Sequence, residues 1–246
     1  MNRNETELPF DFRDELRREG PIEVEGIEYS ADTLIEKLRP LVEDKRWERI
    51  ESVVQNRTWN LMTVTEQLYD IGNLSAVMRS AESFGFLPFT VLDRKGSEYK
   101  KSDRISKGSE KWLHIRHEHD TTDCVKSLQA KGYQVMATSL ENSIPIQEVD
   151  FSKPTALVFG NERDGISKEM AAAADATIQI PMQGFTQSFN ISVAAALCFQ
   201  TAFNARNSAL GNSGDMNDGE KMNLMAQYLM RSIGSPEKNA QILARS

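Results

Sequence analysis

Apolar residues follow two different spacings along the chain, and each spacing predicts its own kind of element. From about residue 58 to residue 207, short continuous apolar runs alternate with segments of helical spacing. The predicted strands are LMTVTEQ, LPFTVLD, KWLHIRH, YQVMATSL, TALVFGNE and TIQIPM. The predicted helices are NLSAVMRSAESFG, TTDCVKSLQAKG, SKEMAAAADA and the segment from Ser188 to Asn207. Strands that are apolar throughout and alternate with helices indicate an α/β fold with a mostly parallel sheet.

The segments on either side of this core have a different pattern. Residues 1–57 hold short charged stretches with helical spacing, and Pro40 predicts a break between two of them. Residues 208–246 open with the loop sequence NSGDMNDGE and continue as an amphipathic helix. We therefore expect a core of residues 58–207 with helical extensions at both ends.

Composition narrows the class of protein. The hydrophobic content of 39% and charged content of 26% are typical of a globular chain. The first 20 residues mix acids and bases, which does not resemble a secretory signal. Cys124 and Cys198 are interpreted as small apolar residues in a reducing compartment. We expect a cytoplasmic protein, or a chloroplast or mitochondrial one if a transit peptide has been removed.

Charge gives two opposite indications about nucleic acid. The net charge of −7 argues mildly against phosphate binding. Residues 93–112, however, hold seven Lys or Arg against four acids, and Arg13, Arg17 and Arg18 form a second basic group. These groups are either solvated surface or RNA contacts.

Several motifs of common α/β enzymes are missing from the sequence. No strand is followed by G-x-G-x-x-G, and G-x-x-x-x-G-K-[ST] and G-x-S-x-G are both absent. A nicotinamide oxidoreductase, the general alternative for this fold class, is therefore disfavoured. The stretch HIRHEH has no cysteine nearby, so we expect no metal.

Polar residues gather after three of the predicted strands, where ligands of open α/β sheets bind. In NLSAVMRS, Asn73 is predicted to cap a helix, and Arg79 lies opposite the apolar stripe of that helix. In FGNERDGIS, glycines let the backbone approach a ligand, while Ser167 is predicted to cap the next helix. In QGFTQSFNIS, Ser188 either caps a helix or lines a ligand site, and Asn190 lies past that cap.

These three segments, in this order, resemble the motifs of the SpoU family of RNA ribose 2′-O-methyltransferases, within the SPOUT superfamily. The resemblance runs from about Thr63 to Arg206 and includes GSEKW at 108–112. It implies a SPOUT fold with a C-terminal trefoil knot, a homodimer, and S-adenosylmethionine as the cofactor. The substrate it implies is RNA, above all the tRNA D-loop guanosine 18. Ribosomal RNA methylation, or an RNA-binding relative without catalysis, are the alternatives.

The resemblance also assigns residues. The catalytic set is Arg79, Asn73, Glu162, Ser188 and Asn190. The cofactor set is Thr138, Ser139, Leu140, Gly160, Asn161, Glu162, Ile180, Met182, Ser188, Phe189 and Asn190. The expected RNA contacts are Arg13, Arg17, Arg18, Lys100, Lys101, Arg104, Lys107 and Arg206.

Arg79 is the key residue of the implied chemistry, and its role has two versions. A free guanidinium is a poor base because its pKa exceeds about 12. Either a substrate phosphate helps Arg79 accept the hydroxyl proton, or Arg79 orients the ribose and phosphate while the proton leaves otherwise. The chain also departs from the family pattern: DIGN replaces a common proline or histidine before Asn73, and Phe189 replaces a common leucine.

Overall fold

The structure is a computed structural model that describes residues 16–93, 108–212 and 214–244. The chain divides into two compact units. The sheet unit is Asn56–Asp215, and the terminal unit combines Met1–Gln55 with Met216–Ser246. The core was expected at 58–207 with separate extensions; in the structure, the two ends of the chain belong to one unit.

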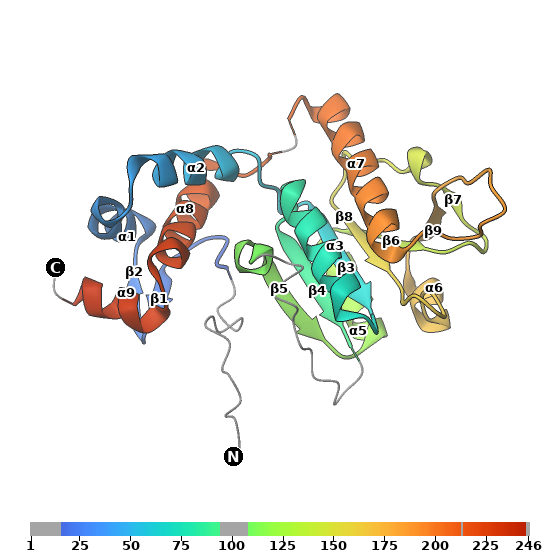
Figure 1. Cartoon of the computed structure of the whole chain (residues 1–246), viewed down its shortest axis with the longest axis horizontal. Helices are drawn as coiled ribbons and strands as arrows, with labels where there is room; N and C mark the ends of the chain where they lie inside the picture. Colours follow the sequence, from blue (N-terminus) through green and yellow to red (C-terminus); the bar gives the residue numbers. More distant parts are fainter. Residues whose placement is uncertain (1–15, 94–107, 213, 245–246) are drawn as a thin grey trace, which may run out of the picture. The chain divides into compact units, whose positions relative to one another are not determined.

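The sheet unit is built on seven parallel strands in the order β5-β4-β3-β8-β6-β9-β7 (Figure 1). Parallel pairing joins every pair of neighbours. The α/β fold with a parallel sheet is therefore confirmed. The strands are β3 (Leu61–Glu66), β4 (Pro88–Leu92), β5 (His114–Glu118), β6 (Gln134–Thr138), β7 (Ile144–Pro145), β8 (Thr155–Phe159) and β9 (Ala176–Gln179).

Helices bury both faces of this sheet, which is why its central strands read as continuous apolar runs. On one face α3 (Ile71–Ser83) packs beside α7 (Ile191–Leu210), and Phe199 of α7 meets Phe159 of β8 edge to face. On the other, α5 (Thr121–Ala130) packs beside α6 (Lys168–Ala173) over Val64, Val158 and their neighbours. Two short 3-10 turns complete the unit, at Ser109–Trp112 and Ile146–Glu148.

The starts of two helices differ from the sequence prediction. Helix α3 is capped by Asp70, whose carboxylate accepts from the Gly72 N–H, so Asn73 lies inside the first turn. Helix α7 is capped by Asn190, not by Ser188. In both cases a second residue with the same capping chemistry stood a few positions away. The predicted cap at Ser167 is confirmed.

The terminal unit is mainly helical. Helices α1 (Ala31–Leu38) and α2 (Asp44–Val54) pack against α8 (Asp218–Ile233), and Pro40 lies in the short 3-10 turn Arg39–Leu41 between α1 and α2, as predicted. Two elements of this unit were not predicted from the sequence: the small hairpin of β1 (Ile22–Val24) and β2 (Ile27–Tyr29), and the last helix, α9 (Pro236–Leu243). In the described ranges, no helix has the length and apolar character that a membrane span requires.

Candidate active site

The predicted cofactor segments meet at one edge of the sheet. Strands β8, β6 and β9 are neighbours and parallel, so their carboxyl ends lie together (Figure 1). Thr138 fixes the end of β6 because its hydroxyl donates to the carbonyl of Val158, at 3.0 Å. The N–H of Ser139 donates to the carbonyl of Ile178, also at 3.0 Å. The loops that follow these strands therefore leave the sheet side by side.

The loop after β8 is folded tightly on itself. Asn161 and Gly165 exchange two backbone hydrogen bonds, of 3.0 and 3.1 Å. A Cβ at Gly160 would lie 2.1 Å from the backbone carbon of Gly165, a distance that no real side chain tolerates. The Asn161 side chain accepts from the N–H groups of Arg163 and Asp164, at 2.9 and 2.6 Å. This loop can form only with glycine at position 160.

A chain of hydrogen bonds joins one residue from each of the three motifs. Asn73 donates from Nδ2 to Oε1 of Glu162, at 2.8 Å, and its Oδ1 accepts from Nδ2 of Asn190, at 3.3 Å. The Asn190 side-chain oxygen also accepts from the N–H and hydroxyl of Ser192, at 2.9 and 2.6 Å. The backbone N–H of Tyr69 approaches the other Glu162 oxygen at 3.3 Å. The start of α3, the loop after β8 and the start of α7 are thereby tied together.

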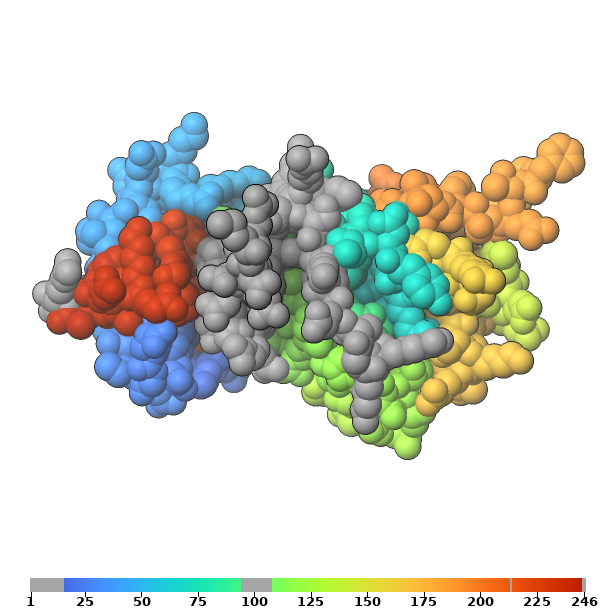
Figure 2. Space-filling model, turned by 60° about the horizontal axis from the view of Figure 1, so that its bottom comes forward, coloured from blue at the N-terminus to red at the C-terminus, as the bar shows by residue number. Residues whose placement is uncertain are grey.

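Apolar side chains are exposed or half-buried in the segments that follow β6 and β9. Leu140 is 58% exposed and Phe189 is 41% exposed, while Ile180 and Met182 are half-buried. Ser188 is exposed in the loop between β9 and α7, whose orange atoms project from the surface in Figure 2. Exposed apolar side chains beside polar ones suit a ligand that has both a flat apolar ring and hydrogen-bonding edges.

Arg79 lies apart from this hydrogen-bonded chain. It is six residues along α3 from Asn73, which places it about 9 Å farther on and about 120° around the helix. Its side chain is exposed and makes no hydrogen bond or ion pair with the part of the chain that the structure describes. The structure thus gathers Asn73, Glu162 and Asn190, whereas the Arg79 guanidinium has no partner among the described residues.

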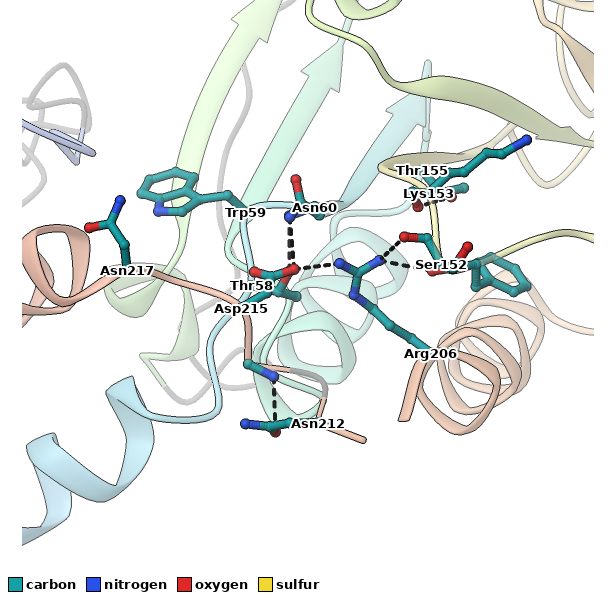
Figure 3. Close-up of polar contacts among 12 residues, drawn as sticks. Thr58, Trp59, Asn60, Ser152, Lys153, Thr155, Arg206, Asn212, Asp215 and Asn217 are labelled. Atoms are coloured by element: carbon teal, nitrogen blue, oxygen red, sulfur yellow. Dashed lines mark hydrogen bonds and ion pairs between the residues drawn. The ribbon is translucent and has the colours of Figure 1, made fainter. Parts of the chain in front are cut away.

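The prediction that Arg206 contacts RNA is wrong, because its side chain is only 3% exposed. Its guanidinium donates to the carbonyls of Phe151 and Ser152, at 2.8 and 3.1 Å, and to the carboxylate of Asp215, at 2.5 Å (Figure 3). The same Asp215 oxygen accepts from Thr58 and Asn60. Arg206 is therefore an internal connection between the end of α7, the segment before β8 and the segment that enters β3.

The other predicted RNA contacts remain predictions. In the terminal unit, Arg18 pairs with Glu220, and Arg17 lies 3.8 Å from Glu23, yet both arginine side chains stay about half exposed. Arg13, Lys100, Lys101, Arg104 and Lys107 lie outside the described residues.

Titratable groups outside the motifs offer little chemistry. Burial lowers the pKa of His117, against the opposing effect of Asp93. Burial also raises the pKa of Cys124 to about 11 and that of Cys198 to about 12, so both thiols are protonated and unreactive at neutral pH. Within the described ranges, no three His, Cys, Asp or Glu side chains are grouped so that they could hold a metal ion.

One buried carboxylate at this edge was not among the residues predicted from the sequence. Glu66 ends β3 and is 1% exposed, and it accepts hydrogen bonds from Ser167, the cap of α6. A signal was present, because a charged residue at the end of an apolar strand needs buried partners. Tyr69 and Ser192, which donate to Glu162 and Asn190, were not predicted either, and nothing in the sequence around them indicated these contacts.

A parallel sheet with polar residues gathered beyond the carboxyl ends of its central strands is typical of ligand-binding α/β proteins. The sequence of residues 60–200 matches the SpoU rRNA Methylase family. The match covers more than half of the chain, and the chain belongs to this family.

Individual relatives agree with the family assignment. The tRNA (guanosine(18)-2′-O)-methyltransferase of Thermus thermophilus is 38% identical over 155 residues, which are 63% of this chain and 79% of the relative. The crystal structure of the A. aeolicus TrmH/SpoU tRNA modifying enzyme has a TM-score of 0.70 and 29% identity, and the match covers 77% of this chain and 98% of that one. The SpoU methyltransferase AviRb from Streptomyces viridochromogenes, solved in complex with the cofactor AdoMet, has a TM-score of 0.54 and 25% identity. The match covers 64% of this chain and 62% of that one.

Proposed function

We propose that this chain transfers a methyl group from S-adenosylmethionine to the ribose 2′-hydroxyl of guanosine 18 in the D-loop of tRNA. The observation that carries the proposal is the hydrogen-bonded chain of Asn73, Glu162 and Asn190. It brings together the three segments by which the chain resembles its family, at the edge where open α/β sheets generally bind their ligands. The substrate is that of the relative from Thermus thermophilus.

The residues at this edge fit the methyl donor. Leu140, Ile180 and Met182 offer apolar surface for an adenine ring, and the close-packed loop at Gly160 lets the backbone approach the ligand. Thr138 and Ser139 hold the β6 loop in place. When bound, the cofactor would supply an electrophilic methyl group on a sulfonium.

The proposed role of Arg79 rests on its exposed side chain, which has no hydrogen-bond or ion-pair partner within the described ranges. An arginine holds its proton at neutral pH, so by itself it is a weak acceptor for the proton of a ribose hydroxyl. Its planar fork suits a phosphate oxygen pair and can hold the target nucleotide by its backbone. We propose that Arg79 binds the substrate phosphate as a guanidinium and orients the 2′-hydroxyl, whose proton passes to water as the methyl group is transferred to its oxygen. Such alignment can supply a large share of a rate enhancement.

Three further features belong to the same proposal. We propose a homodimer and a trefoil knot in the C-terminal part of the sheet unit, both from the family resemblance. We propose RNA contacts for the terminal unit, where Arg17 and Arg18 keep exposed guanidinium surface. The free, buried cysteines support a reducing compartment, the cytoplasm or an organelle.

The test is methyl transfer from labelled S-adenosylmethionine to unmodified tRNA transcripts, with the modified ribose mapped by its resistance to alkali. Wild type is compared with Arg79→Ala and with Lys126→Ala, a charge-matched control on the exposed side of α5. We expect methylation at the D-loop guanosine, roughly hundredfold slower in Arg79→Ala and unchanged in the control. Transfer to ribosomal RNA and not to tRNA would move the substrate assignment, and normal cofactor binding without any transfer would indicate an inactive relative.

A further inference from the structure

Glu66 places a carboxylate inside the protein, directly beside the loop after β8 (residues 160–167, called the glycine loop below). It is the last residue of β3, and the pairing of Thr65 with Phe159 puts it next to Gly160 at the ends of the two strands. The side chain is 1% exposed. A buried carboxylate is costly unless hydrogen bonds compensate for its lost hydration. The buried carboxylate therefore requires hydrogen-bond donors, and these donors show which segment of the chain Glu66 holds in place.

The partners of Glu66 come from the far end of the glycine loop and from α5. Oε2 accepts from the N–H of Ser167, at 2.8 Å. Oε1 accepts from the Ser167 hydroxyl, at 2.7 Å, and from the Thr121 hydroxyl, at 3.2 Å. All three partners are donors, so the position requires an acceptor on both oxygens, which a carboxylate provides and an amide does not.

Ser167 connects this carboxylate to the loop. While its hydroxyl donates to Glu66, its oxygen accepts from the N–H of Met170 and caps α6. The loop thus has two anchors. At its start Gly160 packs against Gly165, and at its end Ser167 is fixed by Glu66. The residues between these anchors include Asn161 and Glu162, which are assigned to the methyl-donor site.

We infer that Glu66 is a positioning residue that sets the conformation of the methyl-donor loop through Ser167. The inference rests on the proposed function, because it assigns the loop to S-adenosylmethionine. Because its side chain is buried, Glu66 acts on the loop through Ser167 and not by contact with a ligand. With the carboxylate in place, the loop is already in its binding conformation, and the ligand does not have to order it.

The test measures cofactor affinity and loop order in the same variants. In Glu66→Gln one carboxylate oxygen becomes an NH₂ group that faces donors, while size is kept. Thr122→Val is the matched control, because it removes another side-chain hydrogen bond between α5 and α6, from Thr122 to Glu169 at 2.7 Å, on the surface. We measure the Kd for S-adenosylmethionine by calorimetry, amide hydrogen exchange of residues 163–166 in the cofactor-free protein, and Tm.

Glu66→Gln is expected to raise the Kd roughly tenfold and to speed exchange in the loop, while Thr122→Val changes neither. Ser167→Ala should weaken binding less, and adding it to Glu66→Gln should change the Kd little further, since both act through one contact. If Glu66→Gln does not fold, Ser167→Ala and Thr121→Val carry the test, and an unchanged Kd and exchange rate in Ser167→Ala would overturn the inference.

A merely structural Glu66 gives a different result. In that case Glu66→Gln lowers Tm but leaves the Kd and the loop exchange at wild-type values, which would overturn the inference and leave the proposed function standing. A wild-type protein that does not bind S-adenosylmethionine would overturn the proposed function, and this inference with it.

Discussion

The amide nitrogen of Asn73 lies 2.8 Å from a carboxylate oxygen of Glu162, although 89 residues separate them in the sequence. Asn73 uses its amide oxygen at the same time to accept from Asn190. An asparagine is suited to this position because its side chain both donates and accepts. It is thus the centre of the contact that joins the three motifs.

Asn73→Asp should disable this contact more than loss of the side chain does. A carboxylate at position 73 would face the carboxylate of Glu162 without a proton to share, and like charges at this distance repel. We expect kcat/KM for tRNA to fall roughly ten- to hundredfold, with Asn73→Ala milder. Asn204→Asp, an exposed change on α7 that adds the same charge, is the control. Equal activity in Asn73→Asp and the control would show that this contact does not contribute to the reaction.

Gly160→Ala should damage the loop after β8, which we propose binds the cofactor. The added Cβ would meet the backbone of Gly165 and Ile166 at 2.1 and 2.2 Å, so the loop must move. We expect a loss of stability of about 1–3 kcal/mol, together with weaker binding of S-adenosylmethionine. Gly184→Ala is a suitable comparison, because the nearest atom there is 3.9 Å away. Calorimetry measures the affinity for S-adenosylmethionine, and urea unfolding measures the stability. Wild-type affinity in Gly160→Ala would contradict a role of the tight packing between Gly160 and Gly165 in cofactor binding.

Arg206→Met should reduce stability without a specific effect on RNA binding. The change leaves the partly buried carboxylate of Asp215 without its arginine, which costs about 3–5 kcal/mol for a buried pair. Arg163→Ala, at a side chain that is 85% exposed, should cost under about 0.5 kcal/mol. Urea unfolding measures both. A normal unfolding curve for Arg206→Met with a large loss of tRNA affinity would instead restore Arg206 as an RNA contact.

The buried thiols predict a loss of stability at alkaline pH. Burial is the main cause that raises the pKa of Cys124 from 9.0 to about 11 and that of Cys198 from 9.0 to about 12. Above pH 9 the unfolded chain releases these protons while the folded chain keeps them, so this stabilising contribution is full below pH 9 and is lost as pH rises through 11 and 12. The slope is about 1.4 kcal/mol per pH unit for each thiol.

Replacing the two cysteines tests this linkage. The free energy of unfolding of the Cys124→Ala, Cys198→Ala double variant should fall less between about pH 8 and about pH 10.5 than that of wild type, by about 1–2 kcal/mol per thiol. The comparison between the two proteins cancels the titration of groups they share. Identical pH dependence would mean that these thiols titrate in the fold as they do in the unfolded chain.

The sheet could be predicted from the sequence because its central strands are buried on both faces. In β3, β4 and β8 every residue is buried, so each strand reads as one apolar run. The two-residue strand β7 and the three-residue strands β1 and β2 are too short to have a pattern. Their existence depends on tertiary contacts that a local pattern does not contain.

The residues of the site could be predicted from the sequence, but the hydrogen bonds between them could not. The family motifs named Asn73, Glu162 and Asn190, yet only the fold shows that the first donates to the second and accepts from the third. Arg206 was misread because an arginine in a helix usually lies on the surface. Its partner Asp215 lies in a loop, and no spacing rule relates the two.

The most direct test of 2′-O-methylation at guanosine 18 compares two tRNAs that differ in a single oxygen. One carries guanosine at position 18 of the D-loop and the other carries 2′-deoxyguanosine there, and both are incubated with the enzyme and labelled S-adenosylmethionine. We predict one methyl group per tRNA on the first and none on the second. Equal labelling of both tRNAs would contradict 2′-O-methylation at this ribose.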